Sequence, residues 1–497
     1  MAEPVKKKLC QEDAHVRNSS KTNLINSSEI RRALLHDVKE PIVFHDYLLS
    51  DKASSECNEN YWKCLQWDAP MFADLFGDQL LPFRIGPRLR DEEVLTVPQW
   101  ESTCLKGKMT FSEFLEWSGG QRTCITSCGQ EVHSNNYWAY FDYFYLKELK
   151  ESVFLEGIID WSLFGFSGRG TEESTLWIGS NGANTPCHID TYGCNLVAQV
   201  LGEKRWILFP KSQSQYLSPT RIPYEESSIY SKVGFPRPCL ISHPELCLST
   251  PYVVTLKPGD VLFVPKHWWH FVENLELSVS INTWLEIPTD DEERVKEAFV
   301  MYQVGSLCHG VESVSDITSI FNPNMLDIAA MTSTELLQLL ASKVLKRVDF
   351  NVDRYVLSSS NEDNELMQCK SASSDMFLSH IESSGSEVGH HFYSLSWNSM
   401  TWCAEHGIEK VPKLSYDVFL KNILGSDVKD EYEKSIKILQ TRKEEKTQNL
   451  QDDTVDNSSV SLQDLEILVD TLTDYRVIEV IKQVFDEKVK KAKSTIL

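Results

Sequence analysis

The stretch VLFVPKHWWHF, residues 261 to 271, begins as an apolar run and ends with two histidines and two tryptophans. It follows Lys257-Pro258-Gly259-Asp260, a composition typical of a tight turn. A short apolar run bounded by a turn predicts a buried strand. The imidazoles at its end are either ring residues packed in an ordinary core or side chains held there to bind a ligand.

Short apolar or alternating runs recur on both sides of this stretch, between about residues 40 and 286, and they predict strands. They are PIVFHDYLL (41–49), STLWIGS (174–180), NLVAQVL (195–201), RWILF (205–209), YVVTL (252–256), VLFVP (261–265) and LSVSINTWL (277–285). Connections such as LGEK and KPGD are too short for a helix, which favours an antiparallel sandwich or barrel over a parallel α/β sheet. We expect helices ahead of this block, around residues 109–118 and 137–152.

The chain changes in composition several times outside the strand-rich block. We expect a flexible N-terminal arm at 1–39 with one short helix near SSEIRRALLHDV, the sheet domain at 40–287, a helical extension at 288–357, a serine-rich acidic linker at 358–389, an irregular charged region at 390–460 and amphipathic helices at 461–497. In the helical extension, Thr289 is the predicted N-cap and Glu292 stands at the capping-box position.

Apolar residues at the C-terminal end recur at helical spacing and predict one or two amphipathic helices. They are Leu462, Leu465, Leu468, Val469, Leu472, Val477, Ile478, Ile481, Val484 and Phe485. Two interpretations remain open for this apolar face. It packs back on the domain, or it forms a homodimer or partner surface.

The charge of the chain restricts its partners. It has 49 basic and 72 acidic residues and a net charge of -23, which disfavours nucleic acid and anionic lipid, although an acidic surface can still attract a basic peptide. The first residues lack the apolar core of a signal peptide, and no stretch approaches the roughly 20 apolar residues of a membrane span. We therefore expect a cytoplasmic protein without a membrane segment.

The thirteen cysteines are odd in number and scattered, which indicates free thiols in a reducing compartment. Cys124 and Cys128, followed by His133, resemble half of a zinc site. No second cysteine pair completes it, so free thiols are the favoured interpretation.

A second stretch with the residues of a binding site lies upstream, where His188 and Asp190 are two positions apart in TPCHIDTYGCN. Side chains at that spacing leave the same face of a strand and can reach one ion. Two histidines and one carboxylate suit ferrous iron, because they leave coordination positions open for an oxidant and a co-substrate. We prefer His270 as the third ligand, where the strand resumes, over His267 in the preceding bend, which we expect to face solvent or to lie behind the ligands.

These motifs together resemble one known family. ESTLWIGSNGANTPCHIDTYGCNLV (173–197), PTRIPYEESS (219–228) and VPKHWWHFVE (264–273) are similar to segments of the JmjC-type cupin oxygenases, particularly the asparaginyl-hydroxylase-like branch, over about residues 40–287. The resemblance implies a double-stranded β-helix (a jelly roll), mainly β with flanking helices and a C-terminal helical extension. It also implies dependence on Fe(II) and 2-oxoglutarate.

The resemblance assigns roles to individual residues. It implies that His188, Asp190 and His270 hold iron and that Lys204, in GEKRW, binds the distal carboxylate of 2-oxoglutarate. The remaining positions implied to line the co-substrate pocket are Thr185, Asn195, Asn282, Tyr140 and Trp284. Each of these five is also compatible with ordinary packing. One departure is that Asn195 stands five positions after Asp190, where the asparaginyl hydroxylase has four.

Three functions follow from the resemblance as alternatives. The first is hydroxylation of a cytoplasmic protein substrate, in association with a small heat shock protein and the stress response, since one family member with such a partner shares the quoted segments. The second is an adaptor for a small heat shock protein with little or no catalysis. The third is lysine demethylation. A metabolite-binding jelly roll without redox chemistry would not require Lys204.

Overall fold

Two antiparallel β-sheets pack against each other in the computed structural model. The structure describes residues 27–48, 62–90, 93–149, 158–223, 228–308, 332–338, 340, 407–424, 429–448 and 462–496. The large sheet has the spatial order β17 (Ile408–Lys410), β1 (Ile42–Phe44), β14 (Val261–Val264), β9 (Cys194–Leu201), β16 (Ser278–Leu285), β7 (Thr175–Gly179), β6 (Tyr137–Tyr145), β2 (Leu81–Pro87) and β3 (Leu105–Met109). The small sheet has the order β11 (Pro219–Pro223), β12 (Ser228–Ser231), β8 (Asn184–Asp190), β15 (Trp269–Asn274), β10 (Lys204–Phe209) and β13 (Tyr252–Leu256), and β4 (Cys124–Ile125) pairs separately with β5 (Glu131–Val132).

The 261–271 stretch crosses from one sheet to the other. Val261–Val264 forms β14 between β1 and β9 in the large sheet, and Trp269–Asn274 forms β15 between β8 and β10 in the small sheet. The bend between them holds His267 at a left-handed φ of 64°. Strands that alternate in this way between two sheets make a jelly-roll β-sandwich, which confirms the predicted fold class.

Alternation along the strands separates three apolar clusters. Val261 and Phe263 belong to a cluster on the outer face of the large sheet, whereas Leu262 and Val264 belong to the cluster between the sheets. Trp269 and Phe271 pack on the outer face of the small sheet. Because side chains alternate along a strand, residues that alternate with Trp269 and Phe271, such as His270, face the space between the two sheets.

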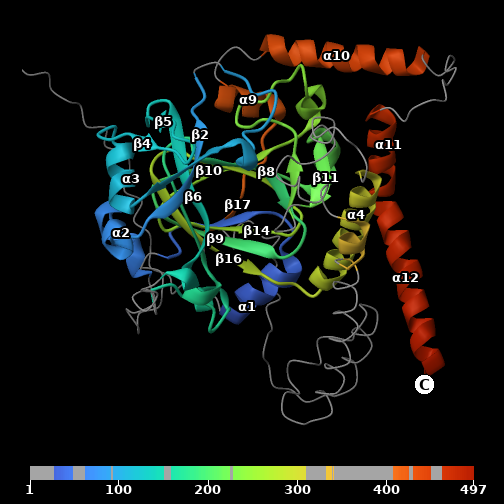
Figure 1. The fold of residues 1–497 in the computed structure, drawn as a ribbon, viewed down its shortest axis with the longest axis horizontal. Helices are drawn as coiled ribbons and strands as arrows, with labels where there is room; N and C mark the ends of the chain where they lie inside the picture. The colour runs from blue at the N-terminus through green and yellow to red at the C-terminus, as the bar shows by residue number, and fades with distance from the viewer. Residues whose placement is uncertain are drawn as a thin grey trace, which may run out of the picture.

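Helices cover both ends of the sandwich. Their bounds are α1 (Ser27–Arg32), α2 (Ala69–Phe76), α3 (Phe111–Ser118), α4 (Asp290–Cys308), α9 (Tyr416–Leu424), α10 (Lys429–Gln448), α11 (Leu462–Leu472) and α12 (Tyr475–Ile496). Helices α4, α11 and α12 lie together on the side opposite α2 and α3 (Figure 1). The predicted helices at 27–38, 109–118, the start of 288–357 and 461–497 are therefore present, and α1 continues into a π-helical turn at Ala33–Asp37.

The C-terminal helices pack back on the domain through α4. The rings of Phe299 and Phe485 are 5.8 Å apart, and Lys296 forms a 2.7 Å ion pair with Glu479. Several apolar side chains of α11 and α12 nevertheless stay exposed, so this packing does not exhaust their apolar surface. They are Ile467, Leu468, Tyr475, Val480 and Val484.

The helix predicted over residues 137–152 is wrong. Residues Tyr137–Tyr145 form β6, which lies between β2 and β7, and a 3-10 turn follows at Leu146–Glu148, whereas positions 150–152 lie outside the described residues. Aromatic side chains fit a pleated surface well, and seven of these nine residues are aromatic. A register shift between Phe141 and Phe144 interrupts the period of two that would have identified a strand.

Regular structure also occurs inside the region expected to be irregular. Residues Ile408–Lys410 form β17, which pairs with β1 at the edge of the large sheet, and α9 and α10 follow. Tyr416, Phe419 and Leu420 of α9 complete the apolar cluster on the outer face of the small sheet. The linker predicted at 358–389 lies outside the described residues.

Because Phe419 is fully buried in that cluster, we expect Phe419→Ala to lower the free energy of unfolding by about 3–5 kcal/mol. Urea denaturation of the full chain measures this change. The matched control is Val418→Ala, since Val418 is 41% exposed and its loss should cost about 0.5 kcal/mol or less. Equal effects of the two changes would mean that α9 does not belong to the core.

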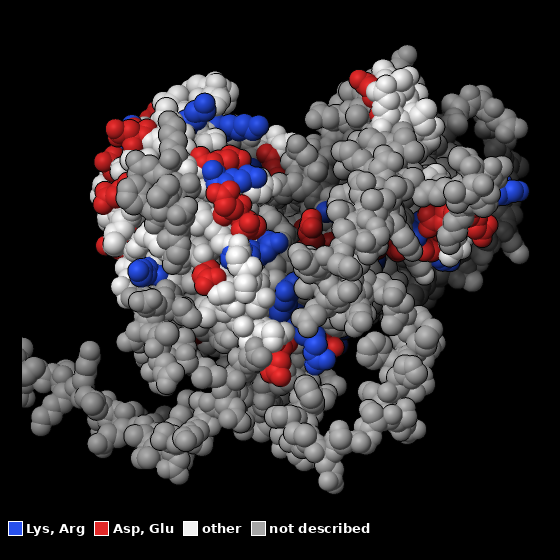
Figure 2. Space-filling model, turned by 90° about the horizontal axis from the view of Figure 1, so that it is seen from below, with Lys and Arg blue, Asp and Glu red and all other residues white. Residues whose placement is uncertain are grey.

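The described surface carries both signs of charge. Figure 2 shows acidic and basic side chains close together on one face, so the net charge of -23 does not make this face uniformly acidic. None of the helices in the described ranges combines the length and the hydropathy that a membrane crossing requires.

Candidate metal centre

The three predicted ligands converge between the two sheets. His188 and Asp190 lie on β8, and His270 lies directly opposite His188 in the register of β15. One ligand atom from each residue lies within 4.8 Å of the other two, and His188 Nε2 is 3.6 Å from Asp190 Oδ1. In the part of the chain that the structure describes, this is the only such group of three or more histidine, cysteine or acidic residues.

Backbone carbonyls fix the orientation of both imidazoles. Nδ1 of His188 lies 2.9 Å from the carbonyl oxygen of Pro186, and Nδ1 of His270 lies 2.9 Å from that of Trp268. Since a carbonyl oxygen only accepts, each ring must donate from Nδ1, which leaves Nε2 as the ring atom available to an ion. A hydrogen bond of this kind is how proteins orient a metal-binding imidazole.

The surroundings keep His188 neutral. Burial, together with the neighbouring His270, lowers the pKa of His188 to about 4. The ring of Tyr230 stacks on His188 at 5.5 Å, and that of Trp206 stacks on His270 at 5.7 Å. Two imidazoles and a carboxylate fit a divalent transition-metal ion and leave further coordination positions open.

Lys204 lies deep in the same cavity, with 1% of its surface exposed. Its ammonium donates to Ser280 Oγ at 2.6 Å and lies 3.5 Å from the hydroxyl of Tyr140. Among the described residues, no carboxylate oxygen comes within ion-pair distance of Lys204 Nζ. Burial lowers the pKa of Lys204 to about 7, against the opposing charge of Asp142. A buried ammonium without an acidic partner fits an anionic ligand.

The other five residues assigned by the resemblance line the same cavity: Thr185, Asn195, Asn282, Tyr140 and Trp284. Asn282 Nδ2 donates to Asn195 Oδ1 at 2.8 Å, and Asn282 Oδ1 accepts from Trp177 Nε1 at 2.7 Å. These bonds hold the two amides in one orientation on β9 and β16. The structure thus brings all nine predicted residues to one cavity, although their roles there remain predictions.

Sequence reasoning missed several residues of the cavity wall. They are Tyr143, Trp177, Val197, Trp206, Ser228, Val272 and Ser280. Ser280 stands two positions before Asn282 on one strand, so a period of two could have placed it on the same face. Tyr143 could not be found in this way, since it has a left-handed φ of 55° within the irregular part of β6.

His267 lies behind the ligands rather than among them. Its Nε2 donates to the carbonyl oxygen of Thr191 at 2.8 Å, and its Nδ1 accepts from Lys211 Nζ at 3.2 Å. Burial and the nearby Lys211 lower its pKa to about 3, so the ring is neutral. Cys124, Cys128 and His133 form no metal-binding group among the described residues, and both cysteines are free thiols.

A jelly roll with two histidines and an aspartate at its centre defines the JmjC-type cupin-like proteins as a class. The chain belongs to the cupin-like domain family, whose model matches residues 39–291.

Particular relatives lie within this class. The chain is 44% identical over 256 residues to "HSPB1-associated protein 1" of Homo sapiens, which covers 50% of this chain and 51% of that protein. It is 41% identical over 283 residues to the Bos taurus protein of the same name, with 56% and 55% covered. "Lysine-specific demethylase 8" of Danio rerio is 28% identical over 221 residues, with 44% and 48% covered. The chain therefore spans about half the length of these relatives.

Proposed function

We propose that this chain is a protein hydroxylase that depends on Fe(II) and 2-oxoglutarate and acts on a cytoplasmic protein. One observation carries the proposal. The group of His188, Asp190 and His270 shares a cavity with Lys204, a buried ammonium that forms no ion pair with a carboxylate among the described residues. A metal site alone suits many cupins, but this cation beside it also fits a bound anion.

Each residue has a defined task in this proposal. His188, Asp190 and His270 would hold the iron, and Lys204 with Thr185 and Tyr140 would bind the distal carboxylate of 2-oxoglutarate. The bound pair supplies oxidation of a substrate C–H bond to C–OH, with dioxygen and 2-oxoglutarate converted to succinate and carbon dioxide.

The cavity wall would serve two further purposes. Asn195 and Asn282 would fix the co-substrate laterally, and the bond between their side chains holds both amides in place. Trp284, which is half-buried and lines this cavity, would limit the entry of water.

The direct test is anaerobic titration of the full chain with Fe(II) and 2-oxoglutarate. A keto acid bound through two oxygens to ferrous iron should give a weak visible charge-transfer band. Absence of this band at saturating ligand would contradict the proposal. Oxygen addition to a protein substrate would then be sought by mass spectrometry, comparing cells that contain the wild type with cells that contain a ligand variant.

The adaptor function remains the second candidate, because α11 and α12 expose apolar side chains such as Ile467 and Val480. Relatives that are named for association with HSPB1 support a small heat shock protein as the partner. A missing charge-transfer band in a folded chain that still binds this partner would favour the adaptor over the hydroxylase.

The affinity for 2-oxoglutarate should fall as pH rises above about 7. The sign follows from Lys204, whose pKa is lowered to about 7 and whose charged form binds the dianion. Above that pH, Lys204 must regain its proton before it binds the dianion, which costs about tenfold in affinity for 2-oxoglutarate per pH unit. Tyr140 stays neutral because burial raises its pKa, and Asp142 is paired with Arg84. Calorimetric titration with 2-oxoglutarate between pH 6.5 and 8.5 measures this change in affinity. An affinity that does not depend on pH would contradict the prediction.

A further inference from the structure

Asp190 is the predicted ligand with the least support from its own strand. It is the last residue of β8, and 22% of its side chain is exposed, against 9% for His188. Three residues, Thr191, Tyr192 and Gly193, connect it to β9. Ser228 on β12 pairs with Asp190, and its hydroxyl lies 3.4 Å from Asp190 Oδ1, so the position of the carboxylate depends on this contact and on how the connection is held.

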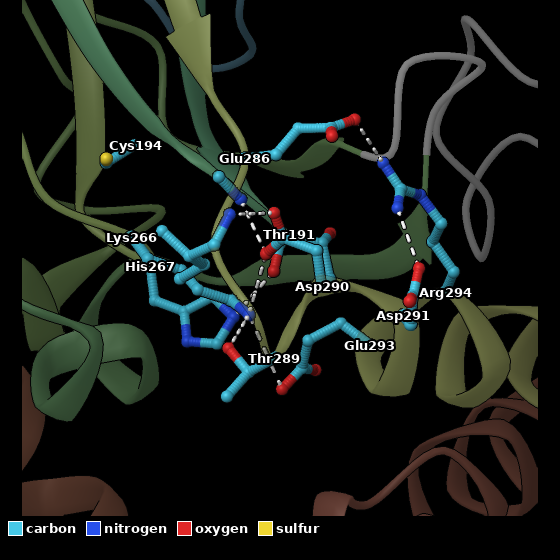
Figure 3. A network of polar contacts seen from close by, with 12 residues as sticks. Thr191, Cys194, Lys266, His267, Glu286, Thr289, Asp290, Asp291, Glu293 and Arg294 are labelled. Carbon is cyan, nitrogen blue, oxygen red and sulfur yellow. Dashed lines mark hydrogen bonds and ion pairs between the residues drawn. The ribbon is translucent and has the colours of Figure 1, made fainter. Parts of the chain in front are cut away.

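The connection is fixed from outside the sheet by the first residue of α4. The carboxylate of Asp290 accepts hydrogen bonds from the backbone N–H of Gly193 at 2.9 Å and of Ile287 at 2.8 Å, one on each oxygen. Lys266 lies 3.3 Å from Asp290 Oδ1, and Asp290 is only 2% exposed. Figure 3 shows Lys266 and His267 beside Thr191 and Asp290 in this network.

We propose that Asp290 is a positioning residue that holds the Thr191–Gly193 connection and thereby sets the metal affinity of Asp190. This inference rests on the proposed function, since it assigns Asp190 as a ligand. Asp290 lies at the N-terminus of α4, and α11 and α12 pack on α4. The carboxylate thus links the metal centre to the C-terminal helices.

A charged carboxylate is required at this position for a geometric reason. Two backbone N–H groups point at its two oxygens, so both oxygens must accept. An asparagine has one carbonyl oxygen and one NH2 group, and the NH2 group would face an N–H donor. One of the two backbone groups would lose its acceptor in a buried place.

The test is Mn(II) titration of the full chain without 2-oxoglutarate, with the free ion followed by paramagnetic resonance. We expect Asp290→Asn to raise the dissociation constant about tenfold, at the lower end of the 10–100-fold typical for residues that support metal ligands. The control is Asp74→Asn, since Asp74 is exposed on α2, which lies on the side of the sandwich opposite α4. Its dissociation constant should change less than twofold.

If Asp290→Asn caused a general loss of structure, the affinities for Mn(II) and for 2-oxoglutarate would both fall. A second measurement therefore separates a general loss of structure from the loss of a residue that positions Asp190. At saturating metal, Asp290→Asn should bind 2-oxoglutarate within twofold of wild type, because the contacts of Lys204 come from Ser280 and Tyr140. Wild-type Mn(II) affinity in Asp290→Asn would overturn the inference while leaving the proposed function intact. No Mn(II) binding by the wild type would instead refute the proposed function.

If Asp290→Asn does not fold, Gly193→Ala tests whether the Thr191–Gly193 connection sets the metal affinity. Gly193 has a φ of +72°, and an added Cβ would lie 3.1 Å from the carbonyl oxygen of Leu285. This change strains the connection while leaving every charge in place. Weaker Mn(II) binding with unchanged 2-oxoglutarate affinity supports the inference, and wild-type Mn(II) binding overturns it.

Discussion

Replacing His270 with alanine is expected to abolish the charge-transfer band and to weaken ferrous iron binding by at least about 100-fold. Loss of an outer-sphere partner alone costs about 10–100-fold in metal affinity, and a ligand should count for more. His270 supplies the only predicted ligand from β15, so its removal leaves two ligands on one strand. Anaerobic absorption spectroscopy and iron analysis of the purified chain measure the two effects.

His133→Ala is the matched control for this change. His133 is exposed and belongs to the alternative zinc motif with Cys124 and Cys128. The band and the iron content should both survive its removal. If His133→Ala lost the metal and His270→Ala retained it, the metal would lie at the cysteine-containing segment and the assignment of the central cavity would be wrong.

Replacing Lys204 with methionine should weaken 2-oxoglutarate binding by about 30-fold or more and leave metal binding intact. The estimate follows from the loss of one partner of a buried charge pair, about 2–5 kcal/mol. Methionine has nearly the length of the lysine stem, so the cavity changes little in shape. Calorimetric titration with Mn(II) in place of iron measures the co-substrate affinity without turnover.

The same change should also stabilise the chain when no co-substrate is bound. Burial of the Lys204 ammonium without a carboxylate partner opposes folding, and the lowered pKa of this group reports that cost. A higher thermal midpoint for Lys204→Met in the absence of 2-oxoglutarate is therefore expected. Lys257→Met is the control, since 68% of the Lys257 side chain is exposed and neither property should change. Unchanged keto-acid affinity in Lys204→Met would remove the main support for the oxygenase.

The sequence predicted those parts of the site that lie on regular strands. His188, Asp190 and His270 were predicted to share one site from the two-residue spacing of the first two, from the bend before His270 and from the family resemblance, and the structure brings them together on β8 and β15. His270 could be separated from His267 because the strand resumes after the bend, and His267 has a left-handed φ in that bend.

Other parts depend on contacts that no local pattern encodes. The strand β6 was mistaken for a helix because its register shift disrupts alternation, although Tyr140 on it contacts Lys204. The hydrogen bond between Asp290 and Gly193 could not be predicted either, since the two residues are 97 positions apart in sequence. Ser280 lies between these two cases. Strand periodicity could have placed it on the cavity face, but its hydrogen bond to Lys204 could not be predicted from the sequence.

The late position of β17 has a consequence for synthesis on the ribosome. β16 ends at Leu285 and β17 begins at Ile408, so 408 − 285 = 123 positions separate them. At about 5–20 residues per second, translation of this interval takes roughly 6–25 seconds. For that time the nascent chain holds β1 with an unpaired backbone edge, a feature that invites association with other chains. Emerging polypeptides of this protein should therefore need protection by a chaperone until residue 424 has left the exit tunnel.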